Sequence, residues 1–314
     1  NLNNHIGAPL SLLTLNNSHS HGVFELGANH IGEISTTSAW VKPDLALITN
    51  IAVANLEGFG SIEGVAKAKG EIFKSLSIDS GIAIVNLDDE RVKQQAMLYR
   101  GNKLTFSMND DADVMAANVI QELAGCYQFG LKYLNQEISI TLKVPGIHNV
   151  SNALAAGAAC LAMNISLIDI KLGLENFKGV AGRLNIKITS QGARLIDDSY
   201  NANLHSVKAA IDVLAQYSGS RIFMLGELAE AGTSLLEQYQ EIGLYAKAKG
   251  IDNFYSCGAE VVKASNNFGP GSKHFQSQLD LISFVGKLLN STTTVLVKGS
   301  RSSKMESVVE SLLN

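Results

Sequence analysis

Short apolar runs alternate with amphipathic stretches along most of the chain. Residues 22–29, 44–52 and 81–89 each contain an apolar run that leads into polar residues, and helical patterns separate these runs. Similar runs recur within residues 193–203, 221–232, 252–260 and 292–303. Alternating strand and helix patterns of this kind are typical of largely parallel sheets covered by helices.

Residues 126–144 follow a different pattern. Hydrophobic residues alternate in two runs separated by Asn135 and Gln136, which predicts a β-hairpin with one solvated face. An Ala-rich helix and a glycine-punctuated segment at residues 177–184 follow it. We therefore predict an α/β protein with a central domain over residues 1–182 and a smaller, Rossmann-like doubly wound domain over residues 183–314.

Length and composition support a folded protein of two domains. A chain of 314 residues exceeds the roughly 250 to 300 residues at which single cores stop growing. A net charge of −4 without a basic stripe argues against nucleic-acid binding. Three widely spaced cysteines and the lack of a long apolar run indicate a reduced cytoplasmic protein that is not inserted in a membrane.

The predicted helix at residues 62–76 places a lysine in an unusual position. Lys69 falls in the middle of an apolar stripe formed by Ile62, Val65, Ala66, Ile72, Phe73 and Leu76, while the opposite face carries Glu63, Lys67, Glu71 and Lys74. The stem of Lys69 could simply cover apolar surface while its ammonium group reaches water. Alternatively, desolvation lowers its pKa, and the neutral amine reacts with CO₂ to give a carbamate that can ligate a metal.

Polar residues at the predicted strand ends are the other candidates, because ligands of open parallel sheets bind beyond the carboxyl ends of the strands. Glu25 closes the first predicted strand and suits Mg²⁺, although a solvated glutamate is the simpler interpretation. Asn55 follows the next strand. Among the seven histidines, His30 is the one that we interpret as functional.

Side-chain amides and cations mark the second half of the chain. Asn149 and Asn152 could contact the edge of an adenine or cap a helix, and Arg183 could bind phosphate oxygens or lie on the surface. One polar cluster comprises Asp197, Asp198, Ser199, Tyr200, Asn201 and Asn203. A second group, Lys298, Ser300 and Arg301, lies where a strand gives way to a helix start, which favours anions such as a carboxylate.

Seven segments in this order resemble the Mur ligase family. They are NLNNHIGAPLSLL, ELGANHIGEI, NLEGFGSIEGVAKAKGEIF, GIHNVSNALAA, AGRL, DDSYNAN and VLVKGSRSSKME. The second and third resemble the branch that adds D-alanyl-D-alanine to UDP-N-acetylmuramoyl-tripeptide, whereas folylpolyglutamate synthases share only the general architecture. The resemblance implies an ATP-dependent amide ligase of peptidoglycan synthesis, acting through an acyl phosphate.

The resemblance also implies a role for each candidate residue. Mg²⁺ would be held by Glu25, Asn55 and a carbamoylated Lys69. ATP would contact Asn149, Asn152, Arg183, Asp198 and Tyr200, with Lys69, Glu25 and Arg183 as the catalytic residues. The UDP-muramoyl-peptide and the D-alanyl-D-alanine would lie near Asn3, Asn4, Asn29, His30, Asn201, Asn203, Lys298, Ser300 and Arg301. A monomer is expected.

Two departures from the family pattern stand out. The phosphate-binding motif GxxGK[ST] does not occur in the 314 residues, so we expect a truncated central domain with an incomplete sheet, poor ATP binding and no ligase activity by this chain alone. Asn55 occupies the position of the family's metal-binding histidine. A noncatalytic remnant or binding subunit, and a related ligase with another substrate, therefore stay open as alternatives.

Overall fold

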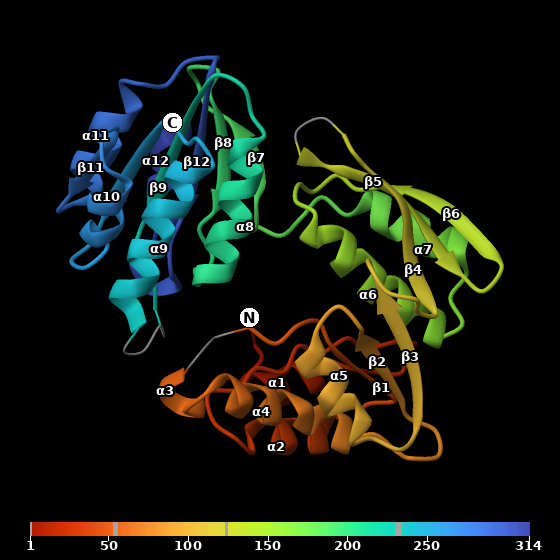
Figure 1. Ribbon diagram of the computed structural model, residues 1–314. Helices are drawn as coiled ribbons and strands as arrows, with labels where there is room; N and C mark the ends of the chain where they lie inside the picture. The colour runs from red at the N-terminus through yellow and green to blue at the C-terminus, as the bar shows by residue number, and fades with distance from the viewer. Residues whose placement is uncertain (1, 53–55, 123–124, 230–233) are drawn as a thin grey trace. The chain divides into compact units, whose positions relative to one another are not determined.

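The computed structural model describes residues 2–52, 56–122, 125–229 and 234–314 and divides the chain into two compact units (Figure 1). Asn55 lies outside the described residues. The first unit comprises Asn1–Val119, Phe129–Ile140 and Val150–Leu174, and the second comprises Ile120–Gln128, Thr141–Asn149 and Glu175–Asn314.

The first half of the chain forms a six-stranded sheet and seven helices among the described residues. The sheet has the order β1-β2-β3-β4-β5-β6, and its first four strands are parallel. The elements are α1 (Gly7–Leu12), α2 (Glu33–Val41), β1 (Leu45–Ile48), α3 (Leu56–Phe59), α4 (Ile62–Lys74), β2 (Ile82–Asn86), α5 (Glu90–Met97), β3 (Asn102–Ser107), β4 (Val114–Gln121), β5 (Tyr127–Tyr133), β6 (Gln136–Thr141), α6 (His148–Ala162) and α7 (Leu167–Asn176).

Capping residues fix the helices that pack on this sheet. Ser61 accepts a hydrogen bond from the Gly64 amide at the start of α4, and Asp89 accepts two from the first turn of α5. Val65 and Phe73 of α4 are buried in the same cluster as Val85 of β2. The predicted hairpin is confirmed, because β5 and β6 are neighbours joined by only two residues.

The predicted first strand at residues 22–29 is wrong. These residues form no strand, and Val23 is 92% exposed. In this segment the Gly27 amide donates a 2.8 Å hydrogen bond to the Asn3 carbonyl. A strand needs a ladder of such bonds, so an apolar pattern without a pairing neighbour stays irregular.

The second half forms another six-stranded sheet, with the order β11-β10-β9-β12-β8-β7. All its neighbours are parallel except β7 and β8. The elements are β7 (Asn185–Ile188), β8 (Arg194–Asp198), α8 (Leu204–Ala215), β9 (Ser220–Leu225), α9 (Leu235–Ala248), β10 (Asn253–Cys257), α10 (Val262–Phe268), β11 (Ser272–Phe275), α11 (Gln278–Gly286), β12 (Thr293–Lys298), the 3₁₀ helix η3 (Arg301–Ser303) and α12 (Glu306–Leu313).

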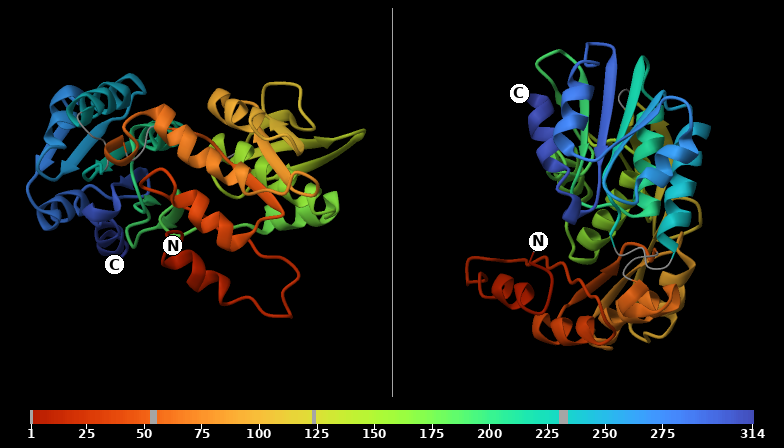
Figure 2. Two further views of the ribbon diagram at one scale, coloured as in Figure 1. Left: turned by 90° about the horizontal axis from the view of Figure 1, so that it is seen from below. Right: turned by 90° about the vertical axis from the view of Figure 1, so that its left-hand side faces the viewer.

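Helices cover both faces of this second sheet (Figure 2). Phe223 on β9 and Leu296 on β12 pack with α8, α9 and α10 in one core cluster. Their strand neighbours Met224 and Val297 pack with α11 and α12 in another cluster. This alternation defines a doubly wound sheet and confirms the predicted α/β fold class.

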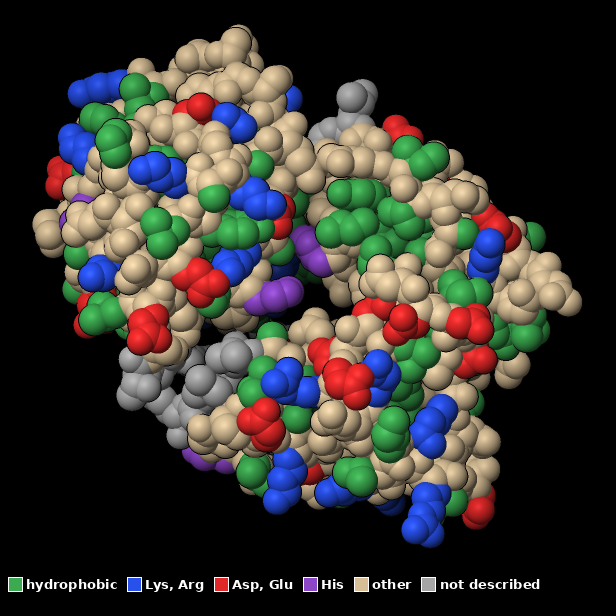
Figure 3. Space-filling model, in the orientation of Figure 1, with side chains coloured by type: hydrophobic (Ala, Val, Ile, Leu, Met, Phe, Trp, Pro, Cys, Tyr) green, Lys and Arg blue, Asp and Glu red, His purple; other side chains and the backbone are tan. Residues whose placement is uncertain are grey.

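The molecular surface carries charges of both signs. Acidic and basic side chains are interspersed on the face drawn in Figure 3. The three cysteines, Cys126, Cys160 and Cys257, are free thiols. None of the helices formed by the described residues is long and apolar enough to cross a membrane.

Candidate functional site

Helix α4 carries Lys69 on a side that differs from the prediction. The lysine side chain is exposed, whereas Ala68, Gly70 and Glu71 are buried. The opposite flanks of the helix are covered, because Gly70 closely approaches Gln95 of α5 and Glu71 bonds to α2. The exposed side chain agrees with the interpretation in which the ammonium group of Lys69 reaches water, because periodicity does not tell which arc of a helix its neighbours cover.

The ammonium group of Lys69 is nevertheless perturbed. Desolvation lowers the pKa of Lys69, and the charge of Glu25 opposes that shift. The side chain of Lys69 therefore keeps contact with water while the surrounding protein disfavours its charged form. The two predicted residues are thus close enough to interact, and the shift favours the neutral amine that carbamate formation needs.

Glu71 was placed on the solvent face by its sequence pattern, and that prediction is wrong. Its residue exposure is 7%, and its two carboxylate oxygens accept hydrogen bonds from the amides of Gly32 at 2.8 Å and Ser35 at 3.0 Å. These amides belong to the start of α2, where the helix dipole favours a negative charge. Glu71 therefore joins the helix of Lys69 to the helix that follows His30.

The loop segments of the first unit are organised by acidic side chains. Glu33 accepts hydrogen bonds from the Asn29 amide at 2.8 Å and pairs with His30 Nδ1 at 3.2 Å. The bond from the Asn29 backbone is the main reason that the pKa of Glu33 is lowered. Glu25 accepts a 2.7 Å bond from the Asn3 amide group.

Asn4 has a local structural contact. Its side-chain oxygen Oδ1 accepts hydrogen bonds from the backbone amides of Ile6 at 3.1 Å and Gly7 at 2.8 Å. The side chain thereby supports the entry into α1. Asn3, Asn29 and His30, by contrast, are linked to the acidic residues Glu25 and Glu33.

The described donor set near Lys69 fits a magnesium ion only in part. Within the described ranges, no group of three or more His, Cys, Asp or Glu side chains could hold a metal. Mg²⁺, however, commonly uses one or two carboxylates and fills its remaining positions with water and substrate phosphate. Glu25 would supply one carboxylate to such an ion, and a carbamate on Lys69 would supply a second oxygen ligand.

The start of α6 carries the predicted adenine contacts. Asn149 donates a 2.8 Å hydrogen bond to the Pro145 carbonyl, and Asn152 is exposed one turn later on the same side of the helix. Their neighbour His148, which the sequence did not single out, has its pKa lowered to about 4, mainly by burial. The imidazole of His148 is therefore neutral at pH 7.

Two predicted nucleotide residues lie against each other in the second unit. The guanidinium carbon of Arg183 is 4.4 Å from the centroid of the Tyr200 ring. The Tyr200 amide donates a 3.1 Å hydrogen bond to the carbonyl of Gly182, which adopts a φ of 72°. A side chain at Gly182 would crowd Tyr200, with its Cβ 3.1 Å from the Tyr200 Cβ. Glycine therefore permits both the turn and the close approach.

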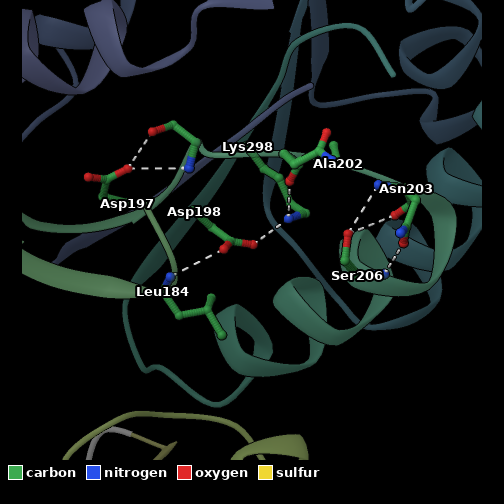
Figure 4. Close-up of polar contacts among 9 residues, drawn as sticks. Leu184, Asp197, Asp198, Ala202, Asn203, Ser206 and Lys298 are labelled. Carbon is green, nitrogen blue, oxygen red and sulfur yellow. Dashed lines mark hydrogen bonds and ion pairs between the residues drawn. The ribbon is translucent and has the colours of Figure 1, made fainter. Parts of the chain in front are cut away.

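A buried ion pair joins the ends of β8 and β12 (Figure 4). Lys298 Nζ lies 2.5 Å from Asp198 Oδ2 and donates a 2.9 Å bond to the Asn201 carbonyl. The other Asp198 oxygen accepts a 3.2 Å bond from the Leu184 amide. Desolvation raises the pKa of Asp198 and lowers that of Lys298, while each partner opposes the shift of the other.

The remaining predicted residues of this region divide between buried and exposed positions. Asn203 forms a capping box with Ser206 at the start of α8, as Figure 4 also shows. Ser300 is fully buried. Asn201 and Arg301 are exposed, and Arg301 donates a 3.0 Å bond to Glu306. The expected helix after β12 begins as the 3₁₀ helix η3 rather than as an α-helix.

A cavity of about 370 Å³ lies beside these residues within the second unit. Its lining includes the predicted residues Tyr200 and Arg301 together with Lys187, Asp197 and Glu306. Glu306 Oε2 is buried and has no hydrogen-bond partner among the described residues. Glu306 and Lys187 were missed because a lone charged residue in a helix or edge strand resembles ordinary surface.

Known proteins resemble this chain over nearly its whole length. The Mur ligase middle domain matches residues 1–160, and the Mur ligase glutamate ligase domain matches residues 182–301. The UDP-N-acetylmuramoyl-tripeptide–D-alanyl-D-alanine ligase of Escherichia coli K12 is 42% identical over 99% of this chain and 69% of its own length. The ligase of the same name from Haemophilus influenzae is 40% identical, over 99% of this chain and 68% of its own length.

Solved structures agree with these sequence matches. A crystal structure of MurF from Acinetobacter baumannii has a TM-score of 0.91 at 34% identity and covers 100% of this chain and 69% of that chain. MurF from Thermotoga maritima in complex with ADP has the same fold, with a TM-score of 0.84 at 22% identity over 98% of this chain and 70% of that chain.

The two α/β units and the two domain matches define an ATP-dependent ligase. The chain belongs to the Mur ligase family, and it comprises the family's middle domain and its glutamate ligase domain. The resemblance predicted from the seven sequence motifs is confirmed.

Proposed function

We propose that this chain is the ATP-using part of a ligase that joins D-alanyl-D-alanine to UDP-N-acetylmuramoyl-tripeptide in the cytoplasm, as a monomer. The observation that carries the proposal is the 42% identity to a ligase of that name over 99% of the chain. ATP phosphorylates the terminal carboxylate of the tripeptide to an acyl phosphate. The amine of the dipeptide then attacks the acyl carbon, forms the amide bond and releases phosphate.

Arg183 and Tyr200 are the proposed centre of nucleotide binding in the second unit. A guanidinium group stacked 4.4 Å above an aromatic ring keeps its in-plane donors available for phosphate oxygens. Asn149 and Asn152 are proposed to contact the adenine, because their amides carry both donors and acceptors. During phosphoryl transfer, Arg183 would offset the negative charge that develops on the phosphoryl group.

Glu25 and Lys69 are the proposed ligands of a magnesium ion, with Asn55 as a third. When bound, Mg²⁺ neutralises phosphate charge and polarises the phosphoryl group. The lowered pKa of Lys69 supports carbamate formation, because only the neutral amine attacks CO₂. Asn3 would orient Glu25 through their 2.7 Å hydrogen bond.

The peptide substrates are proposed to lie at two places. Asn3, Asn4, Asn29 and His30 would face the muramoyl peptide, and Glu33 would hold Asn29 and His30 in position. Asn201, Asn203, Lys298, Ser300 and Arg301 would form or support the site of the peptide or dipeptide, where Arg301 lines the 370 Å³ cavity. An exposed guanidinium group is well suited to the dipeptide carboxylate.

A reconstitution assay tests this function. The full gene-encoded protein is mixed with ATP, Mg²⁺, UDP-N-acetylmuramoyl-tripeptide and D-alanyl-D-alanine, and the pentapeptide product is measured by mass spectrometry together with released phosphate. We expect one phosphate for each amide bond formed, and no product when the dipeptide is omitted. Equal turnover with glutamate or other amines would favour a related ligase instead.

Asn55 gives a specific reason to keep the noncatalytic alternative. An amide oxygen can ligate Mg²⁺, but the family that the sequence resembles has a metal-binding histidine at this position. We expect the full gene-encoded protein to need more Mg²⁺ for half-maximal turnover than its Asn55→His variant. Unchanged Mg²⁺ dependence would argue against a ligand role for this position, and lack of turnover by both proteins would favour the noncatalytic alternative.

A further inference from the structure

We propose that Lys298 is a positioning residue, which acts through Asp198 and the Asn201 carbonyl to hold the Tyr200 loop in the conformation that binds nucleotide. The inference rests on the proposed function, because it takes Arg183 and Tyr200 as the ATP contacts. It differs from the expectation that Lys298 and Asp198 touch ligands themselves. The geometry around the two residues supports the new role.

Neither residue has surface to offer a ligand. Lys298 is 2% exposed and Asp198 is 7% exposed. The two residues are register partners at the ends of the parallel strands β12 and β8, so their side chains leave the sheet side by side. The ammonium group of Lys298 is directed to the Asn201 carbonyl and to Asp198, and Figure 4 shows its contact with Asp198.

The ion pair connects three segments that are distant in sequence. Lys298 ends β12, Asn201 belongs to the loop after β8, and Asp198 accepts the Leu184 amide from the glycine-rich turn. That turn and that loop meet again where the Tyr200 amide bonds to Gly182. Arg183 and Tyr200 therefore take their positions from segments that Lys298 and Asp198 tie together.

Energetics point in the same direction. A fully buried ion pair gains little net stability over apolar side chains of the same size, because desolvation of both charges offsets their attraction. Such a pair is better suited to holding backbone segments in position, since its hydrogen bonds to the Asn201 carbonyl and the Leu184 amide are directional. Loss of the ammonium group would free the Asn201 carbonyl and leave Asp198 without its charged partner.

The experiment separates position from stability with two variants of the full gene-encoded protein. Lys298→Met removes the charge and keeps a long unbranched side chain, but it leaves a buried carboxylate unpaired. The double variant Asp198→Asn with Lys298→Met removes both charges, so we expect it to regain part of the lost unfolding temperature. Methionine cannot donate to Asn201 in either protein.

We expect both variants to raise the KM for ATP by about tenfold or more, as for the loss of one charge-assisted hydrogen bond, with little change in the KM for the dipeptide. Lys249→Met is the matched control, because Lys249 pairs with Asp212 at 2.6 Å on the exposed surface of the same unit. This control should stay within about twofold of wild type. A KM for ATP that recovers together with the unfolding temperature would show a purely structural role and overturn the inference.

Amide hydrogen exchange distinguishes failure of this inference from failure of the proposed function. The Tyr200 and Leu184 amides, which bond to Gly182 and Asp198, should exchange faster in both variants than in wild type and in the Lys249→Met control. Unchanged exchange in Lys298→Met would refute the positioning role, whatever the enzyme does. If the wild-type enzyme makes no ligation product but amide exchange increases in the variants, the proposed function is wrong. The positioning of the Tyr200 loop by Lys298 is then still supported.

Discussion

The clusters around Lys298 and Lys69 use a lysine in two different ways. Desolvation lowers the pKa of both amines, and a carboxylate opposes the shift in both cases. Lys298 is 2% exposed and its donors point to protein groups, whereas Lys69 has an exposed side chain. A lowered lysine pKa therefore accompanies a buried amine bonded to protein groups at Lys298 and an accessible amine at Lys69.

The largest expected difference between the clusters is in stability. Asp198→Asn leaves the Lys298 ammonium group buried without its charged partner, so we expect a loss of about 3 to 5 kcal/mol in the free energy of unfolding. Asp212→Asn breaks an exposed ion pair and should cost less than about 1 kcal/mol. Urea denaturation of the two variants measures both values, and equal losses would remove the distinction between buried and exposed pairs.

Acid should destabilise the protein through His148. Burial lowers its pKa to about 4, with smaller contributions from the charges of His205 and Lys298. Between pH 4 and the ordinary value near 6.5, the unfolded state binds more protons than the folded state, so the free energy of unfolding rises with pH. The total change is about 3 kcal/mol. His148→Asn should flatten this part of the pH profile, and an unchanged profile would contradict the shift.

Glu71 tests how strongly one helix restrains another in the first unit. Glu71→Ala leaves the Gly32 and Ser35 amides without their acceptor and should cost about 1.5 to 3 kcal/mol. Glu63→Ala, on the exposed side of the same helix, should cost much less than Glu71→Ala. Thermal unfolding of the two variants measures the difference. Similar losses would mean that the buried carboxylate has no special structural effect.

The sequence predicted the strands of the sheets better than it predicted which helix residues are buried against neighbouring elements. Alternating apolar residues identified the hairpin and the doubly wound sheet, because sheet-forming patterns are local. The segment at residues 22–29 has the same kind of pattern but forms no strand, since pairing depends on a neighbour that the pattern does not contain. Local periodicity therefore predicts a potential strand rather than its partner.

The polar clusters show the same limit at the level of single side chains. Motifs brought Arg183 and Tyr200 to attention, and the structure places them in contact. The burial of Lys298 was not evident, because its partner Asp198 lies 100 residues away in the chain. Glu71 was assigned to solvent for a similar reason, since the amides that it binds lie 36 and 39 residues earlier.

The capping box at the start of α8 offers a smaller test of the buried cluster. Asn203→Ala should cost about 1 kcal/mol, and Asn203→Gly only a few tenths, because glycine is tolerated at this position. A substrate role predicts a different order, in which both variants lose the side-chain amide and bind the peptide equally poorly. Denaturation curves and substrate KM values, measured on the same two variants, separate capping from binding.

The smallest expected effect on stability, and a large one on function, belongs to Lys69. Lys69→Met should change the free energy of unfolding by less than about 0.5 kcal/mol, because the side chain is exposed. Turnover of the full gene-encoded protein should fall by about 10 to 100-fold, as for the loss of a residue that supports a metal ligand set. Lys67→Met, exposed on the same helix, is the control.

A carbamate on Lys69 can be detected directly by NMR. With ¹³C-labelled bicarbonate, a carbamate resonance should appear in wild type and in the control but not in Lys69→Met. If the wild-type protein turns over without this resonance, Lys69 acts as an amine and not as a carbamate. The role of the exposed Lys69, in contrast to the buried Lys298, would then depend on its charge alone.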